Sequence, residues 1–190
     1  RVSTFLLARY LVLNEDPDYK TASELAVQML KEQPDNGQLI RWKKELPALQ
    51  NGGINSMMTA FSAKDVKGRP VSQDDLRHKV NVLSAWASWN YTSTDMQRRL
   101  QQLKKKHGEQ LGVVSICLDV RPGDCKQRVE RDSLPWKTVC DGRMWQTPLW
   151  AKFGIADIPA NLLINENGRI IARDLSPQQL EEHINDLLKK

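Results

Sequence analysis

The cysteines carry the most reactive side chains of this sequence, and there are three of them, at positions 117, 125 and 140. No two are separated by only two residues, so the chain lacks both a Cys-x-x-Cys pair and the spacing of zinc ligands. We therefore expect no metal site. Because three is odd, at least one thiol is free or pairs between chains. Cys117 lies in an apolar run, Gly112 to Asp119, that predicts a buried strand, so we expect it to be a small core side chain.

Cys125 and Cys140 are the two candidate reactive thiols. A helix capped by Asp124 and running to about Arg131 would place Cys125 in its first turn, exposed to solvent, where the helix dipole lowers a thiol pKa. Cys140 ends a short predicted strand near a loop. Two alternatives stay open: a structural disulfide between the two cysteines in an oxidising compartment, or residual thiol chemistry at either one.

The stretch from Val80 to Met96 offers a second place for function. It starts as a short apolar run, typical of a buried strand, and breaks at the turn and N-cap residues Asn90-Tyr91-Thr92-Ser93. It continues as a helix with Met96, Leu100 and Leu103 on one face. A strand that leads into a helix N-terminus presents backbone N–H groups and a positive dipole end at the junction. We expect a binding site at this junction.

The order of elements around this junction predicts an α/β fold. Strands near residues 80–86, 112–119 and 134–141, with helices between them, indicate a right-handed βαβ arrangement with a parallel core. Two further strands, 161–165 and 169–173, flank the turn Glu166-Asn167-Gly168, a strong hairpin signal. A capping box at 176–179 begins the last helix. The pattern predicts a central mixed sheet flanked by helices.

Residues 1–50 show a different, all-helical pattern. We expect helices over about 5–13, 19–32 and 38–46, with Leu25, Met29 and Leu30 of the second one facing inward and the third one stopping near Pro47. The sequence Asn51-Gly52-Gly53 is the best boundary. The prediction is a helical appendage over residues 1–50 and an α/β domain over residues 51–190.

Composition narrows the class of protein. The 190 residues are 40% hydrophobic and 27% charged, which is typical of a soluble globular protein and fits one domain with an appendage. Apolar runs are far shorter than a membrane span. The net charge is +5, and the basic residues are spread along the chain except for a group on the helix after the junction. This group indicates a solvated helix face, so we expect no nucleic-acid partner. The chain opens at Arg1 without a signal-peptide pattern, so we expect a mature or trimmed chain.

The junction also carries a family resemblance. The sequence Trp-Ala-Ser-Trp at 86–89, followed by X-x-x-X and a helix, resembles the active-site segment of thioredoxin-like thiol–disulfide oxidoreductases, in particular the TlpA/ResA-like, AhpC/TSA-type branch of the bacterial envelope. That family reads Trp-Ala-(Ser/Thr)-Trp-Cys-x-x-Cys. Here Asn90 and Ser93 stand at the two cysteine positions, and Met96 stands where the family often has a Glu. The resemblance covers about residues 55–190 and implies a thioredoxin-like fold.

The resemblance implies a groove beside the junction. Thioredoxin folds place a cis-proline before the third core strand, which here predicts a cis bond between Ile158 and Pro159, with backbone groups that can pair with an extended peptide. It also implies a periplasmic or envelope location. Since thiol exchange needs a thiolate and a resolving thiol, Asn90 and Ser93 cannot perform it.

The leading hypothesis is therefore a family member that has lost redox catalysis and binds a polypeptide or small ligand, without a cofactor. The predicted groove is formed by Trp89, Asn90, Tyr91, Thr92, Ser93, Ile158 and Pro159. One alternative is a residual thiol–disulfide oxidoreductase that uses Cys125 or Cys140. Another is a structural or interaction module of a larger envelope protein, with its partner packed on the helical appendage.

Overall fold

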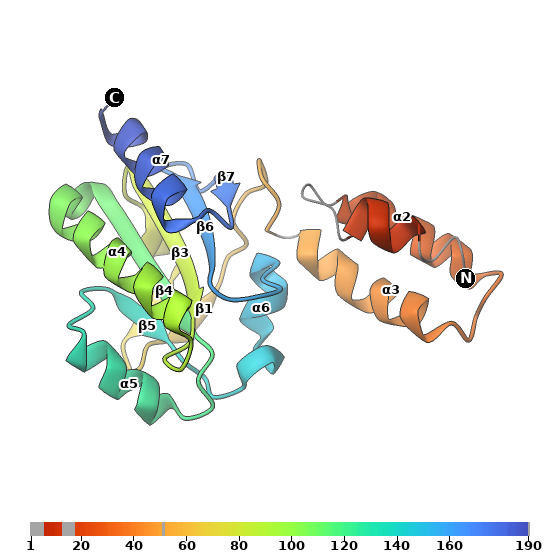
Figure 1. Ribbon diagram of the computed structural model, residues 1–190, viewed down its shortest axis with the longest axis horizontal. Helices are drawn as coiled ribbons and strands as arrows, with labels where there is room; N and C mark the ends of the chain where they lie inside the picture. The colour runs from red at the N-terminus through yellow and green to blue at the C-terminus, as the bar shows by residue number, and fades with distance from the viewer. Residues whose placement is uncertain (1–5, 13–17, 51, 190) are drawn as a thin grey trace.

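The structure is a computed structural model that describes residues 6–12, 18–50 and 52–189. A pair of helices projects from one side of an α/β body (Figure 1). The helical part consists of a π-helical turn η1 (Ala8–Val12), α2 (Tyr19–Leu30) and α3 (Gly37–Gln50). Phe5, Leu13 and residues 14–17, which separate the first two predicted helices, lie outside the described residues. The division at residues 51–53 into appendage and domain stays a prediction.

The helical pair differs from the prediction in two respects. Leu25 is 38% exposed, because the small residues Ala22 and Ala26 form the buried face of α2. The third helix does not stop at Pro47 but runs through it to Gln50. A proline inside a helix removes one backbone hydrogen bond, but Leu46 just before it is buried in the small core between the helices, and this contact holds the last turns in place.

The α/β body is built on a five-stranded mixed sheet in the order β5-β4-β3-β6-β7. Three strands are parallel and the last two antiparallel, as the sequence predicts. The strands are β3 (Val80–Trp86), β4 (Leu111–Cys117), β5 (Lys137–Val139), β6 (Ala160–Asn165) and β7 (Ile170–Arg173). Every residue of β3 and β4 is buried, which explains their continuous apolar runs. A small hairpin, β1 (Ser62–Lys64) and β2 (Pro70–Ser72), precedes the sheet.

Helices cover both faces of the sheet and create two apolar layers. One layer includes α4 (Tyr91–His107), α5 (Pro122–Arg131) and α7 (Pro177–Lys189); Figure 1 shows α4 and α7 side by side over the sheet. The other includes α6 (Pro148–Phe153). Short 3-10 turns, η2 (Gln73–Leu76), η3 (Gly108–Gln110) and η4 (Met144–Gln146), complete the chain. Among the described helices, none combines the length and apolarity that a membrane crossing requires.

Strand polarity brings several chain segments to one edge of the sheet. The parallel strands β3, β4 and β5 all end there, at Trp86, Cys117 and Val139. Strand β6 begins there, because Ala160 pairs with Ala85. The segments after β3, β4 and β5 and the segment before β6 therefore surround the N-terminus of α4, and this edge positions the candidate site.

Asp65 stabilises the turn between β1 and β2. Its buried carboxylate accepts hydrogen bonds from the backbone N–H groups of Lys67 (2.9 Å) and Arg69 (2.8 Å) and forms an ion pair with the Arg69 guanidinium at 2.7 Å. Burial raises the pKa of Asp65, but the hydrogen bonds from Arg69 and Lys67 outweigh it and hold the pKa below its usual value. The carboxylate form is thus favoured in the folded state.

We predict that Asp65→Ala lowers the free energy of unfolding by about 2–3 kcal/mol at neutral pH, because buried donors lose a charged acceptor. Since the pKa is depressed by folding, this contribution is present above the unfolded pKa of about 3.9 and is lost as the pH falls through the folded value. Urea unfolding at pH 7 and at pH 3 measures both effects. Asp186→Ala, which removes an exposed ion pair with Lys189, should change stability by less than about 1 kcal/mol. Equal effects of the two variants would contradict the prediction.

Candidate functional site

Asn90 is the N-cap of α4. Its side-chain oxygen accepts hydrogen bonds from the Ser93 backbone N–H at 2.8 Å and from the Thr92 hydroxyl at 2.7 Å. Ser93 is fully buried, and its hydroxyl has no partner within the described part of the chain. The Asn90 oxygen is therefore occupied in capping, and the Ser93 hydroxyl is not presented to solvent.

Large side chains around this cap are exposed. Trp89 is 60% and Tyr91 77% exposed, and Val120, just beyond β4, is 58% exposed. The loop that carries Trp89 is fixed to the neighbouring strand end by a 2.9 Å hydrogen bond from the Ser88 N–H to the carboxylate of Asp119. Exposed aromatic and aliphatic groups on a rigid sheet edge form a surface suited to binding.

The bond between Ile158 and Pro159 is cis, as predicted. Ile158 is nearly buried, and its N–H donates a 2.7 Å hydrogen bond to the Asp157 carboxylate. The predicted use of this amide by a bound peptide would therefore require the peptide to compete with Asp157. The strand register places residues 89–93 and 158–159 at the same edge of the sheet. That they form one groove stays a prediction.

The three cysteines meet, which the spacing in the sequence did not indicate. Cys117 ends β4, Cys140 follows β5, and Cys125 lies on α5; their sulfur atoms lie within 4.8 Å of one another. Cys117 is buried, as expected. Cys125 is not exposed as predicted but fully buried, because α5 begins at Pro122 and Asp124 is inside the helix rather than its cap. All three are free thiols.

Hydrogen bonding differentiates the three thiols. Thiols of Cys117 and Cys125 donate toward Cys140, and with the backbone N–H of Gly142 they lower the pKa of Cys140 to about 4. Burial raises the pKa of Cys117. The prediction that Cys125 would be the most acidic thiol is wrong, because its pKa is also raised. The hydrogen bond that Cys125 accepts from Cys117 favours the Cys125 thiolate. The hydrogen bond that Cys125 donates to Cys140, together with burial, has the larger and opposite effect. As a thiol, Cys140 donates to the carbonyl of Asp119 at 3.3 Å.

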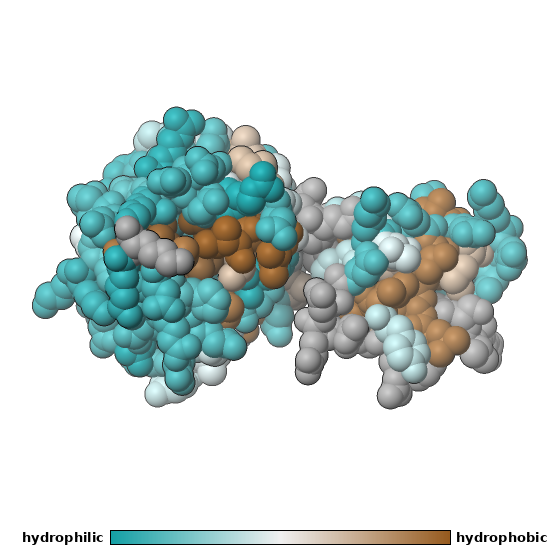
Figure 2. All heavy atoms as spheres, turned by 90° about the horizontal axis from the view of Figure 1, so that it is seen from above, coloured by the Kyte–Doolittle hydropathy of each residue, from teal (hydrophilic) through white to brown (hydrophobic). Residues whose placement is uncertain are grey.

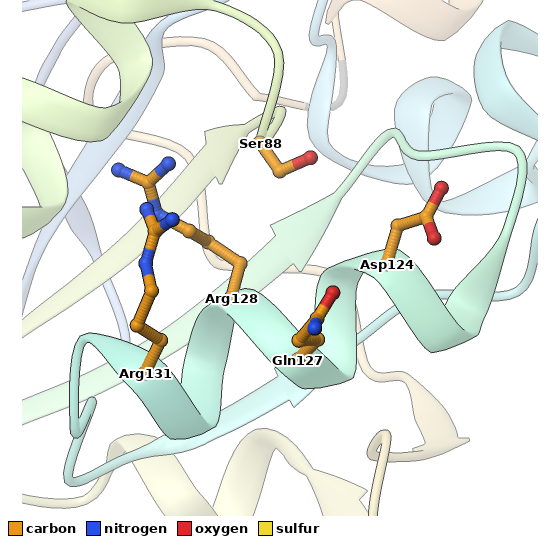
Figure 3. A pocket seen from close by; sticks show the side chains of 5 residues that line it. All are labelled: Ser88, Asp124, Gln127, Arg128 and Arg131. Carbon is orange, nitrogen blue, oxygen red and sulfur yellow. The ribbon is translucent and has the colours of Figure 1, made fainter.

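An open pocket of about 310 Å³ lies between the β3 end and α5. It is lined by Ser88, Asp124, Gln127, Arg128 and Arg131, and Figure 3 shows the two arginine side chains side by side beyond Gln127. Both guanidinium groups bind the carboxylate of Asp132, at 2.5 Å from Arg128 and 3.2 Å from Arg131. Their charge is thus partly compensated. The sequence analysis did not identify this pocket, because its residues are separated by about 40 positions.

The tryptophans divide into core and surface groups. Trp86 and Trp136 are buried, and the Trp136 indole donates to the Ser115 hydroxyl at 3.1 Å. Trp150 is buried and donates to the carbonyl of Met144 at 2.7 Å. Trp145 stacks on Trp150 with ring centroids 5.4 Å apart but remains 47% exposed. Trp86, Trp136 and Trp150 therefore pack in the core, and Trp145 does so only partly.

A mixed sheet with this strand order, a helix entering at the end of its central strand and a cis-proline before β6 together define a thioredoxin-like protein. A family model described as AhpC/TSA family matches residues 54–173. The chain belongs to this family.

Relatives of known description support the assignment. The chain is 25% identical over 134 residues to the thiol-disulfide oxidoreductase ResA of Bacillus thuringiensis subsp. konkukian, covering 68% of this chain and 73% of that protein. A solved thiol-disulfide oxidoreductase from Bacteroides fragilis is 25% identical, with a TM-score of 0.63, over 70% of this chain and 99% of that chain. The thioredoxin domain of a Bacteroides vulgatus thiol-disulfide oxidoreductase shares the fold, with a TM-score of 0.61 at 21% identity over 70% and 96% of the two chains.

Proposed function

We propose that this protein is a thioredoxin-fold binder of extended polypeptides that does not carry out thiol–disulfide exchange at the N-terminus of α4. The observation that carries the proposal is the cap itself. The oxidoreductase family that this chain resembles reads Trp-Ala-(Ser/Thr)-Trp-Cys-x-x-Cys at this junction. This chain instead has Asn90, whose side-chain oxygen accepts a hydrogen bond from the Ser93 N–H, and a buried Ser93. Neither side chain supplies a thiolate.

The surface around the cap supports binding without chemistry. Trp89 and Tyr91 are large, exposed and attached to a fixed backbone, so they lose little conformational freedom on contact with a ligand. The helix N-terminus adds backbone N–H groups and a positive dipole end. Pro159 and Ile158 at the start of β6 would form the opposite wall, and an extended peptide would run between them.

The resemblance to envelope oxidoreductases leads us to place the protein outside the cytoplasm. The alternative of a residual oxidoreductase based on Cys125 is disfavoured by the burial of that thiol, since a protein disulfide cannot reach it. Cys140, 9% exposed, is closer to solvent but has no exposed partner thiol within the described residues.

A second candidate function is an interaction through the helical pair. Several large hydrophobic side chains there are exposed: Leu6, Tyr10, Leu25, Val27 and Ile40. Figure 2 shows hydrophobic residues gathered on this part as well as in a strip across the α/β body. The pattern fits the alternative of an interaction module, in which a partner covers the appendage.

We predict that Tyr91→Ala and Trp89→Ala each weaken binding of an unfolded, S-carboxymethylated polypeptide by about 10-fold or more, because aromatic anchors dominate such contacts. Fluorescence anisotropy of the labelled polypeptide measures the affinity, and the blocked cysteines of this probe exclude covalent capture.

Tyr10→Ala is the matched control. Tyr10 is 62% exposed on η1, at a similar exposure to Trp89 but in the helical part, and its removal should leave the affinity within about 2-fold. A loss with Tyr10→Ala and none with Tyr91→Ala would favour the helical pair as the binding surface and overturn the proposal. Absence of binding by the unmodified protein would also overturn it.

A further inference from the structure

The three cysteines form a built site rather than a chance proximity. Ser115 and Thr138 face each other across β4 and β5, with their hydroxyl oxygens 2.8 Å apart. Cys117 and Cys140 are each two residues further along, so both side chains lie on the same face of the sheet. Cys125 reaches them from α5, one turn before the buried Val129. The strand pairing and the packing of α5 thus hold the three sulfur atoms together.

The spacing of the sulfur atoms suits a single ion. A metal bonded to three thiolates at about 2.3 Å each in a plane separates the sulfur atoms by about 4.0 Å. The present upper separation of 4.8 Å needs an inward movement of less than about 1 Å, within the reach of side-chain rotation. The cluster gathers no fourth His, Cys, Asp or Glu ligand atom from the residues that the structure describes. Zinc favours four ligands, whereas monovalent copper accepts three soft thiolates.

A buried carboxylate, that of Asp119, comes two residues after Cys117. Asp119 is 3% exposed; one carboxylate oxygen accepts the Ser88 N–H, and the other, Oδ2, is buried with no hydrogen-bond partner in the described structure. One monovalent ion held by three thiolates leaves a net charge of −2, so the negative charge of Asp119 opposes the loaded site.

We propose that Cys117, Cys125 and Cys140 form a three-thiolate site for one soft monovalent metal ion of the Cu(I) type. Binding forms three metal–sulfur bonds and releases the protons that the thiols still carry, with no change in the oxidation state of sulfur or metal. Cys140, the least buried of the three, lies on the path of entry. Asp119 is not a ligand, and its negative charge weakens binding. The proposal is independent of polypeptide binding at the N-terminus of α4.

Anaerobic titration of the reduced, full chain with Cu(I) against a chromogenic Cu(I) chelator tests the site. We expect one ion per chain, with a sulfur-to-copper charge-transfer band in the ultraviolet, and weak binding of Zn(II). Removal of a side chain that only supports a metal ligand lowers metal affinity by about 10- to 100-fold. Loss of a ligand itself should therefore lower the Cu(I) affinity by about 100-fold or more in each of the variants Cys117→Ser, Cys125→Ser and Cys140→Ser. Circular dichroism and melting of each variant separate loss of the ligand from loss of the fold.

Asp119→Asn keeps an acceptor for the Ser88 N–H and all three thiols, so it distinguishes an electrostatic role from a packing role. We expect it to tighten Cu(I) binding by about 10-fold while the chain stays folded, because it removes a negative charge beside the three thiolates. Tyr91→Ala, outside the cluster, should not change Cu(I) binding. Tighter binding of Zn(II) than of Cu(I) would overturn the proposal, and so would binding that survives all three single cysteine variants. The proposal would also be overturned if the reduced chain bound no Cu(I) and two of its thiols formed a disulfide.

Discussion

The double variant Asn90→Cys/Ser93→Cys should reduce insulin catalytically, whereas the unmodified protein should show no turnover above the uncatalysed rate. The two positions are the N-cap and the third residue of α4, and the Asn90 side-chain oxygen already lies 2.8 Å from the Ser93 N–H. Two thiols placed here are close enough to form a disulfide. The helix dipole lowers the pKa of the thiol at the N-cap, and α4 has no acidic residue in its first turn to oppose this.

The two substitutions should change the stability of the fold only slightly. Replacing an Asn N-cap removes one capping hydrogen bond, about 0.5–2 kcal/mol of stability. Ser93→Cys replaces a buried hydroxyl that has no partner within the described chain by a less polar thiol, so it should be neutral or stabilising. Turnover by the double variant is thus limited by how well the α4 junction and Pro159 still fit a substrate, not by folding.

The single variants are the controls. Asn90→Cys alone supplies an attacking thiolate without a resolving partner and should accumulate mixed disulfides without turnover; Ser93→Cys alone should be inert, because residue 93 is buried. The precipitation of reduced insulin, followed by turbidity, measures all four proteins. Turnover by the unmodified protein would mean that Cys140 or another native thiol reacts. A folded double variant that forms its disulfide but does not turn over would show that the substrate surface itself has diverged.

Local patterns predicted most of the sheet and the junction. The apolar run Val80–Trp86 and the spacing of Met96, Leu100 and Leu103 each reflect burial of one element against its neighbours, and the structure confirms both. The hairpin at 166–168 and the last capping box are likewise local, because turn and cap residues act on adjacent backbone. Such features depend on few residues close in sequence.

The cysteine cluster could not be predicted in this way. It depends on the register of β4 with β5 and on the rotation of α5, which are tertiary properties. One signal was available: Cys125 and Val129 are four residues apart, the spacing of an inward helix face, and this argues against an exposed Cys125. The exposure of Leu25 has a similar origin, since the choice of the Ala22 and Ala26 face for contact is made by the packing of α3 rather than by hydrophobicity.

Gly112→Ala should be the most destabilising single substitution considered for the sheet. Gly112 pairs with Asn81 on the central strand, and an added Cβ would lie 2.3 Å from the Asn81 side-chain oxygen and 2.5 Å from Cδ2 of His78. The Asn81 side chain is fully buried and bonds the His78 backbone twice, accepting from its N–H and donating to its carbonyl, both at 2.9 Å. The methyl group cannot be accommodated without moving this buried amide.

We expect a loss of about 2–4 kcal/mol in the free energy of unfolding, because overpacking of a filled core adds to the loss of buried hydrogen bonds. In a chain of this length each kcal/mol lowers the Tm by about 2–4 °C. Gly123→Ala is the matched control: nothing lies within 4 Å of its added Cβ, and a helical Gly replaced by Ala should leave stability unchanged or raise it by up to about 1 kcal/mol. Chemical unfolding of the two variants measures the difference in stability. If the Gly112→Ala protein were as stable as the Gly123→Ala protein, the Asn81 side chain would have room for a methyl group on β4, and the prediction would be wrong.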